Sequence, residues 1–78
     1  MAHDYDADAR ALADELRRAG YPNRADQLTD DVVGGATGTE IMMGLRWTVD
    51  QLMGSELALP AALLTRARRL RHAIDRAL

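Results

Sequence analysis

Apolar side chains recur every three or four residues along four segments of the chain, and no segment alternates at period two for long enough to predict a strand. This spacing places the apolar side chains on one face of each segment. They are Tyr5, Ala9, Leu12, Leu16 and Ala19; Ala25, Leu28 and Val32, with Val33 at the margin; Ile41, Leu45, Val49 and Leu52; and Leu59, Leu63, Ala67, Leu70, Ile74 and Ala77. The pattern predicts an all-α bundle of four helices, at about residues 4–19, 24–33, 38–53 and 60–77.

Glycine and proline residues separate the first helix from the second and the third from the fourth. Gly20 follows the first helix where a left-handed cap is favoured, and Pro22 then prevents the helix from continuing. Asn23 is placed to cap the second helix. Gly54 ends the third helix, and Pro60, whose missing amide proton costs nothing at the first helical position, opens the fourth.

The stretch GGATGTE, residues 34–40, joins the second helix to the third. Thr37 and Glu40 match a capping box, in which the hydroxyl accepts an amide of the first turn and the carboxylate returns to the cap's own amide. The stretch lacks the Lys and Ser/Thr of a phosphate loop and follows no predicted strand. The stretch therefore predicts the end of the second helix and the start of the third.

The chain of 78 residues has the size of one domain, and we expect residues 1–78 to form a single helical unit. Ala occurs fourteen times and Leu eleven times, whereas Phe and Cys are absent. The lack of cysteine fits a reducing interior, and the longest apolar stretch, residues 57–64, is too short to span a membrane. We therefore expect a cytoplasmic protein with no membrane segment.

The titratable residues form no recognisable catalytic or metal-binding pattern. Asp4, Asp6, Asp8 and Glu15 have the spacing of calcium-loop ligands, but Ala9 stands where that loop needs glycine for its tight turn. Neither of the two histidines has a Ser, Cys or second His at catalytic spacing. We therefore expect no enzyme activity, no cofactor and no metal.

The order of the second helix, a glycine-containing turn and the third helix also fits a helix-turn-helix. Against this, Asp26, Asp30 and Asp31 would face phosphates that demand Arg or Lys. The fourth helix does carry an arginine cluster, so a nucleic-acid-binding regulator remains a second hypothesis. A self-associating or adaptor bundle is a third, because a thin Ala-rich core gains much from a second subunit. The cluster is Arg66, Arg68, Arg69, Arg71 and Arg76.

Met43 and Trp47 lie four residues apart on the third predicted helix, about 160° around it from Leu45. We expect them to be buried beneath the first or fourth helix. The alternative is an exposed anchor of the kind enriched at protein interfaces. Leu57 and Leu64 present the same two alternatives.

The stretches LRRAGYPNRADQL (residues 16–28) and GATGTEIMMGLRWTVDQL (residues 35–52) give the chain a family likeness. Together with its size, they make it resemble the small, acidic, helical immunity proteins encoded beside interbacterial polymorphic or contact-dependent toxins. The resemblance implies a protein without turnover that binds one cognate toxin, in many cases a nuclease, and blocks its active site.

The charge distribution, together with the apolar pair Met43 and Trp47, indicates which residues would contact such a toxin. Residues 1–35 carry a net charge of −4 and residues 36–78 a net charge of +2. Carboxylates of the acidic half would take the place of substrate phosphates and speed encounter with a basic cleft, while an apolar anchor would slow dissociation. The candidates are Asp4, Asp6, Asp8, Asp26, Asp30, Asp31, Met43 and Trp47.

Overall fold

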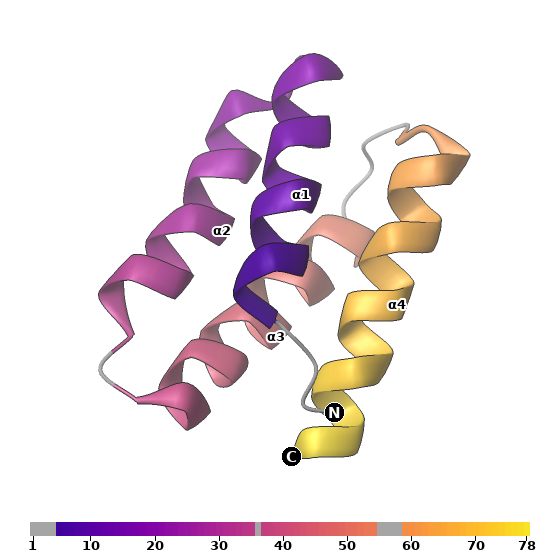
Figure 1. Cartoon of the computed structure of the whole chain (residues 1–78). Coiled ribbons are helices and arrows are strands. Elements are labelled where there is room, and N and C mark those ends of the chain that lie inside the picture. Colours follow the sequence, from indigo (N-terminus) through magenta and orange to yellow (C-terminus); the bar gives the residue numbers. More distant parts are fainter. Residues whose placement is uncertain (1–4, 36, 55–58) are drawn as a thin grey trace.

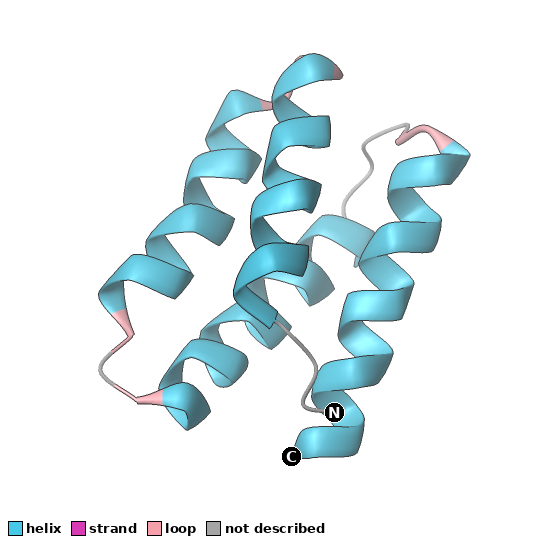
Figure 2. Cartoon of the chain, viewed as in Figure 1, coloured by secondary structure: helices cyan, strands magenta, loops and turns pink. Residues whose placement is uncertain are grey.

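The structure is a computed structural model that describes residues 5–35, 37–54 and 59–78. Four helices make up most of this part of the chain, and no strand occurs within it (Figures 1 and 2). The all-α prediction is therefore confirmed, with boundaries close to those expected. The helices are α1 (Tyr5–Arg18), α2 (Pro22–Gly34), α3 (Gly38–Gly54) and α4 (Ala61–Ala77).

The helices enclose a single core. Each helix packs against the next one along the chain, and α4 packs back against α1. In the view of Figure 1, α1 lies between α2 and α4, and α3 crosses behind them. Because α1 is covered on two sides, its buried surface is broader than one stripe, and Ala13 is buried beside Leu12 although the periodicity did not include it.

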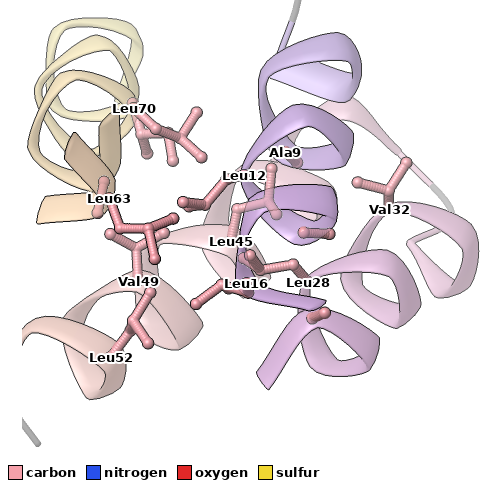
Figure 3. Close-up of a cluster of buried hydrophobic side chains, with 14 residues drawn as sticks. Ala9, Leu12, Leu16, Leu28, Val32, Leu45, Val49, Leu52, Leu63 and Leu70 are labelled. Carbon is pink, nitrogen blue, oxygen red and sulfur yellow. The ribbon is translucent and has the colours of Figure 1, made fainter. Parts of the chain in front are cut away.

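Leucine and alanine make up most of the core (Figure 3). Three positions of the predicted stripes are corrected, because Ala19, Val33 and Ala77 are exposed. Ala19 follows the last residue of α1, Ala77 is the last residue of α4, and Val33 points outward from α2. The buried apolar residues are Ala9, Leu12, Ala13, Leu16, Ala25, Leu28, Val32, Leu45, Val49, Leu52, Leu63, Ala67, Leu70 and Ile74.

The corner between α1 and α2 has the predicted left-handed glycine but a different cap. Gly20 has a φ of 93°, and the next amide, of Tyr21, donates to the Leu16 carbonyl at 2.8 Å. The expected cap at Asn23 is wrong, because α2 begins at Pro22 with Tyr21 at the cap position. Proline lacks the amide proton that the first helical residue would leave unpaired, so Pro22 begins α2 two residues before the predicted start at residue 24. By contrast, Pro60 stands one position before the start of α4 and serves as its cap residue.

The corner between α2 and α3 follows the predicted stop and start. The Glu40 amide donates to the Thr37 hydroxyl at 3.1 Å, which confirms the forward half of the capping box. The return contact of the Glu40 carboxylate stays a prediction. Gly35 has an extended backbone, with a φ of −76°, so its lack of a side chain serves close packing and not a left-handed turn.

Replacing Gly35 with alanine is expected to destabilise the fold by about 1–3 kcal/mol. A Cβ there would overlap Cγ1 of Ile41 and lie 3.1 Å from the Ile41 amide nitrogen and 3.2 Å from the Asp31 carbonyl oxygen. Gly34→Ala is the matched control, because a Cβ at Gly34 meets open space. This replacement should stabilise the fold by up to about 1 kcal/mol. Urea unfolding of both variants measures the effect. Equal unfolding free energies would contradict the close-packing role of Gly35.

Candidate protein-binding surface

The side of α3 that points away from the core exposes two large apolar side chains. Met43 is 59% exposed and Trp47 is 62% exposed, whereas Leu45 is fully buried. The expectation that the pair is buried beneath α1 or α4 is therefore wrong. Of the described helices, α2 and α4 pack most closely against α3, and the exposure of Met43 and Trp47 means that neither covers these two side chains. Of the two leucines that raised the same question, Leu64 is half-buried and Leu57 lies outside the described residues.

Glu40 joins this pair, because it is exposed and lies three residues before Met43 and seven before Trp47, on the same side of the helix. We call Glu40, Met43 and Trp47 the outer face of α3. It combines a broad aromatic ring, a flexible thioether and a carboxylate on one rigid element. Aromatic and methionine side chains are enriched where proteins bind one another.

The edge between α2 and α3 is held by a polar contact. The Thr48 hydroxyl donates to Oδ2 of Asp31, and Thr48 is only 3% exposed. Gly44 lets α2 come close at this point, since a Cβ on Gly44 would lie 3.1 Å from Oδ1 of Asp31. Asp31 was predicted as a residue that binds a partner. The structure also gives it a role inside the fold, and sequence periodicity gave no sign of the buried Thr48 that contacts it.

Partial burial raises the pKa of the Asp31 carboxyl group above its ordinary value. The hydrogen bond from Thr48 opposes this rise, and the charge of Asp30 adds to it. The folded state therefore holds a proton on Asp31 more tightly than the unfolded chain does. The resulting stabilisation is fully present below the unfolded pKa and is lost as the pH rises through the folded pKa.

The Asp31→Asn variant tests this linkage. As the pH falls from about 7 to about 3, the wild-type protein should gain stability relative to the variant, because only the wild type takes up a proton at this position on folding. Urea unfolding of both proteins across that range gives the difference in unfolding free energy, from which the titration of all other groups largely cancels. If the variant gained stability relative to the wild type at acid pH, this would contradict the raised pKa of Asp31.

Charged side chains also connect α3 to α4. The Arg71 side chain of α4 contacts both Asp50 of α3 and Asp75 of its own helix, and these carboxylates raise its pKa. Arg46 lies 4.0 Å from Asp75 and extends the same cluster. These side chains join α3 to α4 beside the outer face, so the helix that presents Met43 and Trp47 is held on both flanks.

The acidic candidates are not gathered into one cluster. Asp6 pairs with Arg10 on α1, and Asp26 lies 3.3 Å from Arg17 near the opposite end of that helix. Asp8 lines a groove between α1 and α4, together with Glu15, Ala62, Thr65, Arg66 and Arg69. Asp4 lies outside the described residues.

One acidic candidate contacts α3, and a second precedes it on α2. Asp31 contacts α3 directly through Thr48, and the exposed Asp30 precedes Asp31 on α2. Within the described chain Asp30 takes part in no ion pair. The structure thus brings Asp31 into contact with the helix that carries Met43 and Trp47, with Asp30 next to it on α2, and leaves Asp6, Asp8 and Asp26 elsewhere.

No helix in the described ranges is long and apolar enough to cross a membrane. In the same ranges, no three or more His, Asp or Glu residues are grouped so that they could hold a metal ion. Comparison of the chain with protein-family models, with curated proteins and with solved structures gave no match.

Proposed function

We propose that this protein is a non-catalytic binding module of the immunity type, which neutralises a bacterial toxin by covering its active site with the outer face of α3. The observation that carries the proposal is the exposure of Trp47 beside Met43. A tryptophan left in water forgoes the stabilisation that burial would give, and tryptophan is among the residues that dominate binding energy at protein interfaces. The resemblance to immunity proteins supplies the class of partner.

The outer face is suited to tight binding because its backbone is already ordered. Leu45, Val49 and Leu52 are buried on the inner side of α3 and fix the helix against the core. An anchor on a fixed helix loses only side-chain freedom when it binds, and preorganisation of this kind lowers the entropic cost of association. Trp47 has two side-chain torsions, which keeps that cost small.

The charges around the outer face favour a basic partner. Glu40 belongs to the face itself, Asp31 lies at the edge with α2, and the exposed Asp30 precedes it on that helix. An apolar centre with acidic side chains on its α2 side fits a basic cleft that contains an apolar pocket, such as the substrate cleft of a nuclease. The carboxylates would steer the two proteins together and occupy the place of substrate phosphates.

Co-expression with the product of the adjacent reading frame tests the proposal. We expect the two proteins to co-purify, and the toxin's activity to fall in proportion to the amount of this protein added. The Asp30→Lys variant should slow association and make it less sensitive to salt, because it reverses one charge of the acidic rim. Asp14→Lys is the control with the same change of charge, since Asp14 is exposed on α1, a helix that is not among those packed most closely against α3.

The proposal fails if the two proteins do not associate, or if Asp14→Lys slows association as much as Asp30→Lys does. Sedimentation at two concentrations decides the alternative of self-association. A dimer that dissociates when Trp47 is replaced would assign the outer face to a second copy of this chain.

A further inference from the structure

The fold divides the arginines of α4 into two groups. Arg66 lies 2.9 Å from Glu15 of α1, and Arg71 contacts Asp50 of α3, so these two join α4 to its neighbours. Arg68, Arg69 and Arg76 are exposed and form no ion pair within residues 5–35, 37–54 and 59–78. The first group stabilises the fold, and the second is available to a ligand.

The second group lies along one stripe of the helix. Together with His72 it lines a shallow depression of about 400 Å³, which Thr65 and Ala73 complete. We call Arg68, Arg69, His72 and Arg76 the basic stripe of α4. From Arg68 to Arg76 the helix rises about 12 Å, a length over which one strand of duplex DNA carries about four phosphates.

We propose that the basic stripe of α4 binds the phosphate backbone of duplex nucleic acid, without reading its sequence. Guanidinium groups donate two parallel hydrogen bonds to a phosphate, and a row of them suits a row of phosphates. This site is separate from the outer face of α3 and does not depend on the function proposed above.

The lack of an apolar anchor favours phosphate over an acidic protein as the ligand. The large apolar side chains exposed on the described surface are Val33, Met43, Trp47 and Leu78, and none of them lines the depression. Protein interfaces have an apolar, aromatic-rich centre, whereas contacts to the phosphate backbone require only donors and positive charge. The two exposed surfaces of this small protein therefore differ in the chemistry that they offer.

Acidic groups near the basic stripe should lower its affinity for phosphate. Asp8 and Glu15 line the groove that Arg69 shares with α1, although Glu15 is engaged by Arg66. Asp75 is engaged by Arg71 on the side of α4 that faces α3. With three arginines and a net charge of −2 for the whole protein, binding should be weak and should depend on low salt.

Fluorescence anisotropy with a labelled duplex of mixed sequence tests the proposal, between about 20 and about 200 mM salt. Three phosphate contacts predict that the logarithm of the binding constant falls with the logarithm of salt concentration with a slope of about −2.7. The triple variant Arg68→Gln, Arg69→Gln and Arg76→Gln should lose at least about ten-fold in affinity.

A second triple variant, Arg10→Gln, Arg18→Gln and Arg24→Gln, is the matched control, because it removes the same charge from α1 and α2. It should retain clearly more affinity than the stripe variant, and circular dichroism should show both variants folded. Absence of binding at the lowest salt, an equal loss in both triple variants, or equally tight binding of polyglutamate would overturn the proposal.

Discussion

Replacement of Leu45 with alanine is expected to lower the free energy of unfolding by about 2–5 kcal/mol. Leu45 is fully buried, and Figure 3 shows it in the middle of the leucine cluster, near Leu12, Leu16 and Leu28. The loss combines the transfer of the removed methyl groups with the cavity left among side chains from several helices. A domain of this size has only about 4–12 kcal/mol of stability, so the variant should lose a large share of it.

Urea unfolding followed by far-ultraviolet circular dichroism measures this effect. The Leu45→Met variant is the control, because it keeps the side-chain volume and should cost less than about 1.5 kcal/mol. A loss below about 1 kcal/mol for Leu45→Ala would mean that α3 does not pack on the leucine core as described.

Replacement of Trp47 with alanine should leave the stability of the fold nearly unchanged but weaken binding to the partner. We expect an unfolding free energy within about 0.5 kcal/mol of the wild type, because the side chain is 62% exposed and lies outside the core. Binding to the co-purified partner should weaken by at least about 2 kcal/mol, which is about thirty-fold in Kd. Isothermal titration calorimetry on the partner gives the second quantity directly.

Val33→Ala is the matched control for this loss, since Val33 is an exposed apolar residue of α2 outside the outer face. If its effect on Kd equals that of Trp47→Ala, the outer face is not the contact surface. Leu45 and Trp47 stand only two residues apart, so the contrast between their variants separates the inner side of one helix from its outer side.

Helical periodicity located the four helices because each must bury one stripe to be stable, and the stripe is visible in the sequence. Gly20 and Thr37 located two of the corners between helices. A left-handed backbone favours glycine, and an unpaired amide at a helix start favours a side-chain acceptor such as threonine. These features depend on local chemistry, which a single sequence carries.

The surface was harder to predict because it depends on which helices lie beside each other. Helical phase placed Trp47 opposite Leu45, but it could not reveal whether another helix covers that side. Likewise, the sequence contained Asp31 and Thr48 without any sign that they meet across two helices. The division of the α4 arginines into bridging and available groups also follows from tertiary packing alone.

Trp47 is the single tryptophan of the chain, so labelling with 5-fluorotryptophan gives one fluorine resonance at the proposed contact. In the free protein this resonance should respond to the exchange of H₂O for D₂O, as that of an exposed indole does. On saturation with the partner it should shift and lose that response, because the ring becomes buried at the centre of the interface. An unchanged, water-sensitive resonance at full saturation would contradict the proposal that the outer face of α3 binds the toxin.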